Sequence, residues 1–268
     1  MNRIDAVFTQ LRQEKKKAFI PFFVAGIPDY RTIRELVLRL EECGVALIEL
    51  GVPFSDPLAD GPIIQMASTE ALKMGVTSRS VFSFVEDLRK ITQIPIALLT
   101  YCNPIFKYGV ERFVSRAITS GVDGIIAPDL PPDESALFTA CAKRHNLKTI
   151  FLATPTTTHE RLKKIASAST GFLYYVSVTG ITGPRDTLPG DIRAHLCHIK
   201  RITRKPVCVG FGISHEHQAR MLAPYADGII VGSALVRILC QERNKKTAQQ
   251  RILHIVKKMQ RAVNAPRS

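Results

Sequence analysis

The feature that most constrains the fold is a regular alternation of eight short apolar runs with helix-length amphipathic stretches. Each run is continuously apolar, which is typical of parallel strands covered on both faces and indicates a barrel-like or doubly wound α/β fold. Eight strands with intervening helices in 268 residues match the size and rhythm of a (β/α)8 TIM barrel. The runs occupy residues 19–26, 47–52, 95–102, 124–130, 148–154, 172–178, 206–212 and 227–234.

No linker rich in Pro, Gly or Ser divides the chain, so we expect residues 1–268 to form a single (β/α)8 barrel domain. Two features add to the basic pattern: an additional N-terminal helix and an extra helical segment at 63–75, after the second strand. The span 178–191, after the sixth strand, is also long. Loops of this kind at the carboxyl ends of barrel strands build active sites or serve as lids.

The composition excludes several classes of protein. No apolar run approaches the ~18 residues that indicate a membrane span, and the first 17 residues carry charges from Arg3 onward, unlike a signal peptide. We therefore expect a cytoplasmic location. The six cysteines form no C-x-x-C pair, so no metal site is expected.

The net charge of +14 raises the question of a nucleic-acid partner. Residues 237–268 hold nine Lys or Arg against one Glu, and within them Ile252, Val256, Met259 and Val263 recur at helical spacing. This pattern predicts an amphipathic helix that packs on the body of the protein and exposes its basic face. Since no aromatic residue alternates with these charges to stack on bases, we expect neither a nucleic-acid nor a membrane partner.

Glycine-containing turns follow the last two expected strands. Gly210 and Gly212 precede Ser214, and Gly232 precedes Ser233 at the expected start of a helix. Backbone N–H groups at such turns favour a dianion, and the loops after strands seven and eight hold phosphate in many barrels. The two turns together predict a phosphate site, to which Gly180 and Gly183 would add a third wall.

A carboxylate, Glu49, interrupts the second apolar run, and Asp60 follows eleven residues later in a loop rich in proline. If Glu49 points into the barrel, burial raises its pKa and allows it to transfer a proton near neutral pH. Two carboxylates in different environments are able to divide acid and base work. The alternatives are a Glu49 paired with Lys or Arg and an Asp60 that only stabilises a turn. Spacing alone does not separate Asp60 from Asp56.

The stretch LIELGVPFSDPLADGP, residues 47–62, resembles the signature of the tryptophan synthase alpha subunit family, the indole-3-glycerol-phosphate lyases. The likeness extends over nearly the whole chain. Further segments that resemble the family are PFFVAGIPD, LLTYCNPIFKYG, GVDGIIAPDLPPDES, VSVTGITGPR, VGFGIS and DGIIVGSAL.

The resemblance implies a retro-aldol cleavage to indole and glyceraldehyde 3-phosphate in tryptophan biosynthesis. Glu49 would transfer the proton, and Asp60 would bind the indole N–H and connect through Thr182 to the sixth loop. The apolar walls would come from Phe22, Leu99, Tyr101, Ile126, Tyr174 and Phe211, and the phosphate ligands would be Gly183, Gly212, Gly232 and Ser233.

The resemblance also implies a partner, a beta subunit that carries pyridoxal phosphate, in an alpha-beta-beta-alpha assembly; the chain itself would need no cofactor. Its contact residues would be Pro53, Asp56, Asn103 and Pro104. Two other functions stay open. One is another phosphosugar barrel enzyme, and the other is a catalytically weakened alpha subunit that acts mainly as a binding partner and activator of the beta subunit.

Overall fold

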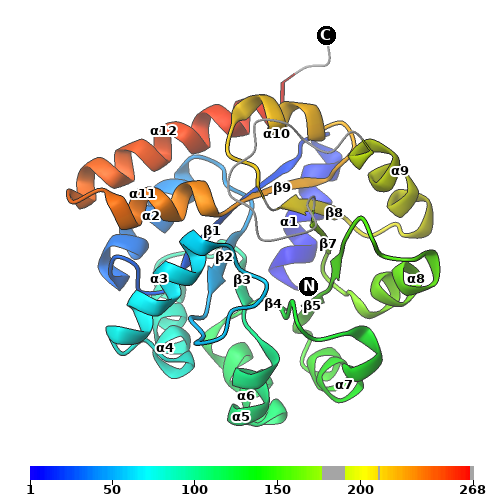
Figure 1. Ribbon diagram of the computed structural model, residues 1–268, viewed down its shortest axis with the longest axis horizontal. Coiled ribbons are helices and arrows are strands. Elements are labelled where there is room, and N and C mark those ends of the chain that lie inside the picture. Colours follow the sequence, from blue (N-terminus) through cyan, green and yellow to red (C-terminus); the bar gives the residue numbers. More distant parts are fainter. Residues whose placement is uncertain (177–190, 211, 266–268) are drawn as a thin grey trace.

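A closed parallel sheet forms the centre of the protein in the computed structural model, which describes residues 1–176, 191–210 and 212–265 (Figure 1). Its strand order is β5-β4-β3-β2-β1-β9-β8-β7-β6, and every neighbouring pair is parallel. Since β5 and β6 are consecutive in the chain, the two ends of this order meet and the expected barrel is confirmed. The strands are β1 (Ala18–Val24), β2 (Ile48–Gly51), β3 (Ile96–Leu99), β4 (Gly124–Ile126), β5 (Lys148–Ile150), β6 (Leu152–Ala153), β7 (Leu173–Val176), β8 (Val207–Gly210) and β9 (Gly228–Val231).

The fifth expected strand, 148–154, is present as two short strands because the ladder breaks at Phe151. The N–H group of Phe151 donates to the hydroxyl of Ser169 at 3.2 Å rather than to a neighbouring strand. On one side of the break β5 pairs with β4, and on the other β6 pairs with β7. One apolar run therefore closes the barrel by pairing with different neighbours at its two ends.

The described helices surround the barrel, as Figure 1 shows. The expected segment after the second strand is present as α3. It spans Pro62–Lys73. The other helices between strands are α2 (Tyr30–Glu42), α4 (Ser78–Arg89), α5 (Cys102–Tyr108), α6 (Val110–Ser120), α7 (Ala136–Arg144), α8 (His159–Ala168), α9 (Ile192–Ile202) and α10 (Glu216–Leu222), and α11 (Ser233–Gln241) follows the last strand.

The sequence did not predict α5, because the third apolar run was expected to continue to residue 102 as a strand. The strand ends at Leu99 instead, and Cys102 opens the helix. The carboxylate of Asp129 accepts the N–H of Cys102 at 2.9 and 3.1 Å from its two oxygens and so stabilises the start of the helix. Gly109, with φ of +87°, then separates α5 from α6.

The additional N-terminal helix, α1 (Arg3–Gln13), closes the end of the barrel at which the strands begin. Ile4 and Phe8 are buried, and the ring of Phe8 lies 5.8 Å from that of Phe172, just before β7. Arg3 binds the buried carboxylate of Asp123, just before β4, at 3.0 Å. With this end filled by side chains, the opposite end is left for a site.

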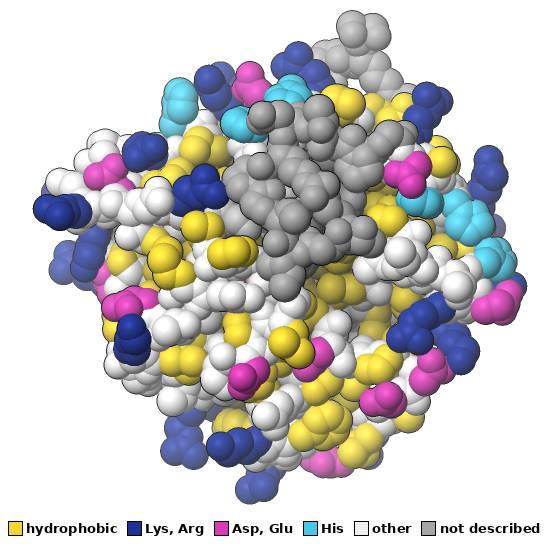
Figure 2. Space-filling view, in the orientation of Figure 1, with side chains coloured by type: hydrophobic (Ala, Val, Ile, Leu, Met, Phe, Trp, Pro, Cys, Tyr) yellow, Lys and Arg dark blue, Asp and Glu magenta, His cyan; other side chains and the backbone are white. Residues whose placement is uncertain are grey.

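The C-terminal helix, α12 (Lys245–Val263), packs as its pattern predicts. Ile252, Val256, Met259 and Val263 are buried, whereas the basic residues between them are exposed. On the face shown in Figure 2, Lys and Arg side chains lie mostly around the periphery. None of the helices in the described ranges is long and apolar enough to cross a membrane.

Candidate active site

Glu49 lies within β2, between Phe22 of β1 and Ala97 of β3, and is 1% exposed. Its Oε2 atom is buried without a hydrogen-bond partner, and it makes no ion pair with any residue the structure describes. The pKa of Glu49 is raised to about 8, mainly by burial and secondly by the charge of Asp60. The alternative to a catalytic role was a Glu49 paired with Lys or Arg. Among the described residues, no Lys or Arg forms such a pair with Glu49.

Asp60 ends the loop that follows β2 and is 4% exposed. Burial raises the pKa of Asp60 to about 6, against the opposing effect of a hydrogen bond from Tyr101. The structure separates this residue from Asp56, which is exposed and hydrogen-bonded to the neighbouring Ser55. Only Asp60 of the two lies in the wall of the cavity described below.

Tyr101 holds the loop that carries Asp60. Its hydroxyl accepts the N–H of Ala59 at 3.1 Å, and its ring stacks on Phe54 with centroids 5.2 Å apart. The loop is also closed from within, because Asp60 N–H donates to the carbonyl of Pro57 at 3.0 Å. These contacts hold the backbone of the loop on both sides of Asp60.

The two carboxyl groups differ in charge near neutral pH. With pKa values of about 6 and about 8, Asp60 is ionised and Glu49 is protonated. One group is thus able to accept a hydrogen bond from a cationic or N–H centre while the other donates a proton. Two such groups in one cavity are able to share acid and base work on one bound molecule.

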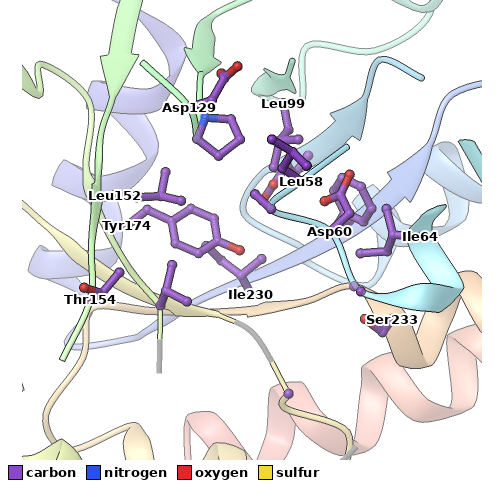
Figure 3. A pocket seen from close by; sticks show the side chains of 18 of the residues that line it. Leu58, Asp60, Ile64, Leu99, Asp129, Leu152, Thr154, Tyr174, Ile230 and Ser233 are labelled. Carbon is purple, nitrogen blue, oxygen red and sulfur yellow. The ribbon is translucent and has the colours of Figure 1, made fainter. Parts of the chain in front are cut away.

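A cavity of about 620 Å³ lies at the open end of the barrel, and both Glu49 and Asp60 line it (Figure 3). Among the expected apolar residues, Phe22, Leu99 and Tyr174 line it. The structure places Tyr101 behind the loop and buries Ile126 in β4, so neither belongs to the lining residues. Figure 3 shows the ring of Tyr174 extending into the cavity.

Sequence reasoning missed several apolar lining residues. Ile64, Leu152 and Ile230 contribute side chains to the wall, and so does the exposed Leu58. A continuously apolar run does not indicate which of its side chains point inward, so no signal singled out Ile230 or Leu152. For Ile64 the position of α3 directly after Asp60 was a usable signal.

The glycine turns meet at one end of the cavity, where Gly212, Gly232 and Ser233 all line the wall. Gly212 has φ of +80°, a conformation that favours glycine. Ser233 is the first residue of α11, so the N–H groups of this helix start face the cavity end. Thr182, Gly183 and Phe211 lie outside the described residues.

The residues expected at a partner interface lie beside the cavity mouth on two segments. Asp56 and Asn103 are exposed, Pro104 is half-buried in the first turn of α5, and Pro53 is buried. Large apolar side chains accompany them, since Leu58 is 79% exposed and Phe106 is 51% exposed. Figure 2 shows hydrophobic side chains on this side of the molecule. Among the described residues, no three His, Cys, Asp or Glu side chains group to hold a metal ion.

Comparison with known proteins identifies the family. The model of the tryptophan synthase alpha chain family matches residues 8–264. The chain belongs to the tryptophan synthase alpha chain family. Its enzyme class is therefore that expected from the sequence, a carbon–carbon lyase that cleaves indole-3-glycerol phosphate in tryptophan biosynthesis.

Individual members of the family resemble the chain over most of its length. The tryptophan synthase alpha chain of Geotalea daltonii is 51% identical over 237 residues, which cover 88% of this chain and 90% of that one. The crystal structure of the alpha subunit from Legionella pneumophila has a TM-score of 0.90 at 35% identity, covering 98% of each chain. A chain of the tryptophan synthase complex from Pyrococcus furiosus has a TM-score of 0.83 at 41% identity, covering 91% of this chain and 98% of that one.

Proposed function

We propose that Glu49 and Asp60 carry out the lyase reaction of this tryptophan synthase alpha chain. The observation that supports the proposal most strongly is that two buried carboxyl groups with separated pKa values, about 8 and about 6, line one cavity. The same cavity has apolar walls for an indole and a helix start for a phosphate. No cofactor of this chain is needed for the chemistry.

In the proposed reaction, protonated Glu49 donates its proton to C3 of the indole, which becomes an indolenine with a positive charge on its nitrogen. Ionised Asp60 accepts the ring N–H and stabilises that charge. The Glu49 carboxylate then removes the proton of the glycerol hydroxyl adjacent to the C–C bond. That bond breaks, its electron pair restores the indole, and the hydroxyl carbon becomes the aldehyde of glyceraldehyde 3-phosphate. Glu49 ends the cycle protonated, as it began.

The remaining residues bind and orient the substrate in this proposal. Phe22, Leu99 and Tyr174 pack on the indole, and Tyr101 fixes Asp60. The N–H groups around Gly212, Gly232 and Ser233 bind the phosphate. Thr182, Gly183 and Phe211 keep the roles that the resemblance implies for them.

We also propose that the chain pairs with a tryptophan synthase beta subunit in the cytoplasm, in an alpha-beta-beta-alpha assembly. The interface would include the loop 53–60 and the first turn of α5, through Pro53, Asp56, Asn103 and Pro104. The exposed apolar side chains of Leu58 and Phe106 beside them support a protein contact here. Pyridoxal phosphate would belong to the beta subunit alone.

The test compares two aspartates of one loop. Asp60→Asn removes the negative charge beside the ring nitrogen, and we expect it to lower kcat for cleavage of indole-3-glycerol phosphate by about 10²-fold or more, the range for lost transition-state electrostatics. Asp56→Asn is the matched control, because it makes the same change 4 residues away on the exposed side. In the isolated chain its turnover stays within about twofold of the unmutated protein, as for most surface changes. Equal effects of the two variants would contradict the assignment of Asp60.

A further inference from the structure

Two cations lie in the wall of the cavity among the residues that the structure describes, and they differ in their partners. Arg161 of α8 forms an ion pair with Asp133 at 3.7 Å, and its side chain is 49% exposed. Arg237 of α11 forms no ion pair with any described residue. Its Nε atom is buried and has no hydrogen-bond partner in the part of the chain that the structure describes.

Arg237 lies at the end of the cavity where the phosphate is expected. It follows Ser233 by four residues on α11, so the two side chains lie on one face of the helix, one turn apart. Ser214, from the turn after β8, lines the same wall. Its hydroxyl oxygen is likewise buried, with no hydrogen-bond partner among residues 1–176, 191–210 and 212–265.

Buried polar atoms are nearly always hydrogen-bonded in folded proteins, so these two atoms in one cavity wall are suited to bind a ligand that forms hydrogen bonds. The ligand must accept hydrogen bonds from a guanidinium group, which donates only. It must also be compatible with helix N–H groups. An anion with several oxygens meets all of these requirements.

Electrostatics points the same way. At neutral pH the ionised Asp60 places a negative charge in the cavity wall, and it disfavours a second anion there. Backbone N–H groups donate hydrogen bonds but carry no net charge. A full positive charge at the phosphate end of the cavity would therefore stabilise a bound phosphate dianion. Among the described wall residues at that end, Arg237 supplies this charge.

We propose that the guanidinium group of Arg237, together with the hydroxyl of Ser214, binds the phosphate of the substrate and selects for its dianionic form. This inference rests on the proposed function, since it assigns two more residues to the phosphate end of the same site. Arg237 adds charge and a planar donor pair to a set of ligands otherwise formed by backbone groups.

The experiment measures binding of glycerol 3-phosphate and, separately, of indole to the full chain by calorimetry at pH 7.5. Arg237→Gln weakens glycerol 3-phosphate by about ten- to a hundredfold, the range for a hydrogen bond to a charged group, and leaves indole within about twofold. Arg237→Lys keeps the positive charge but not the planar pair of N–H donors, and it loses less affinity for glycerol 3-phosphate than Arg237→Gln. Ser214→Ala loses less than tenfold. Arg161→Gln is the matched control and binds both ligands as the unmutated chain does.

Any of three outcomes would overturn the assignment. The first is glycerol 3-phosphate binding by Arg237→Gln within twofold of the unmutated chain, and the second is an equal loss in Arg161→Gln. The third is a parallel fall in indole binding by Arg237→Gln, which a structural role predicts. Cleavage of indole-3-glycerol phosphate by the unmutated chain is followed in parallel. If the unmutated chain does not cleave the substrate but Arg237→Gln selectively loses glycerol 3-phosphate binding, the proposed function is contradicted and this inference is kept. If the unmutated chain cleaves the substrate but Arg237→Gln binds glycerol 3-phosphate as before, this inference is contradicted and the proposed function is kept.

Discussion

Glu49 breaks the apolar pattern of its strand because it faces the interior of the barrel near the mouth, where a carboxyl group is desolvated but reachable by a ligand. Its neighbours in the ladder are apolar, and its Oε2 atom has no partner within the described ranges. Such a group destabilises the fold when ionised, so its presence indicates a function rather than a structural role. The sequence was sufficient to single it out, because a lone charge in a buried strand is conspicuous.

The stability of the protein should record this cost. The folded pKa of Glu49 is raised from 4.5 to about 8, so between these values the native state binds more protons than the unfolded state. Its contribution to the free energy of unfolding therefore falls as pH rises from about 4.5 to about 8. We expect Glu49→Gln to be more stable than the unmutated chain by about 3–5 kcal/mol at pH 9 and nearly equal to it at pH 4.5. Urea unfolding at several pH values measures the difference, and a gap that does not widen with pH would contradict the buried-carboxyl account.

The pH dependence of cleavage should be bell-shaped. In the proposed reaction, Asp60 takes up a proton below about pH 6 and no longer stabilises the ring charge. Above about pH 8, Glu49 loses the proton that it would donate. We expect kcat/KM for the isolated chain to fall on both sides, with apparent pKa values that belong to the pair. A profile that rises steadily from pH 6 to 9 would show that Glu49 must be ionised in the free enzyme.

In the proposed reaction, Tyr101 acts through Asp60. Its hydrogen bond lowers the pKa of Asp60, so Tyr101→Phe should raise that pKa and move the acidic limb of the kcat/KM profile to higher pH. Loss of the bond to Ala59 should cost about 1–2 kcal/mol of stability. Glycerol 3-phosphate binding stays unchanged, because Tyr101 does not line the cavity. An acidic limb that stays in place would leave Tyr101 with a packing role only.

At the scale of elements, the sequence predicted those whose signal is local and missed those fixed by distant residues. The eight apolar runs located the strands, and the pattern of α12 located its buried face. The start of α5 depends on Asp129, 27 residues further on, and the break at Phe151 depends on Ser169. Neither Asp129 nor Ser169 belongs to the segment whose structure it determines, so the local sequence pattern does not predict these two features.

The role of α1 as the closure of the barrel leads to a stability prediction. Ile4 is fully buried. It packs closely on Gly124, the first residue of β4, because a Cβ added at Gly124 would lie 2.9 Å from the Cδ1 atom of Ile4. We expect Ile4→Ala to lower the free energy of unfolding by about 2–5 kcal/mol, the range for a large-to-small core change. Leu11→Ala is the matched control on the same helix, since it removes a side chain of similar volume that is only partly buried, and should cost less.

The KM for indole-3-glycerol phosphate separates closure from catalysis in these two variants. Because α1 lies at the opposite end of the barrel from Glu49 and Asp60, both variants should keep the KM of the unmutated chain while they remain folded. Equal destabilisation by the two changes, or a raised KM in Ile4→Ala alone, would contradict this role.

At the scale of the whole molecule, barrel closure brings together residues far apart in the chain. Glu49 and Asp60 come from β2 and its loop, whereas Gly232, Ser233 and Arg237 come from β9 and α11, beside β1. The spacing of glycines and carboxylates sufficed to predict this convergence once eight parallel strands were recognised. The sequence did not show that Leu152 rather than Ile126 lines the cavity, because both lie in uninterrupted apolar runs. It also did not single out Arg237, because this residue is one of many basic residues near the C-terminal end of the chain.

A single-turnover assay of the isolated chain tests the central assignment most directly. Enzyme in excess over indole-3-glycerol phosphate is followed for the release of indole, first with the unmutated chain and then with Glu49→Gln. If Glu49 transfers the proton, the unmutated chain releases one indole per substrate, whereas Glu49→Gln, nearly isosteric but unable to donate this proton, releases none on that timescale and still binds glycerol 3-phosphate within a few-fold. Release of indole by Glu49→Gln at a rate close to that of the unmutated chain would contradict the assignment, and no release by either would favour a weakened subunit that serves its beta partner as an activator.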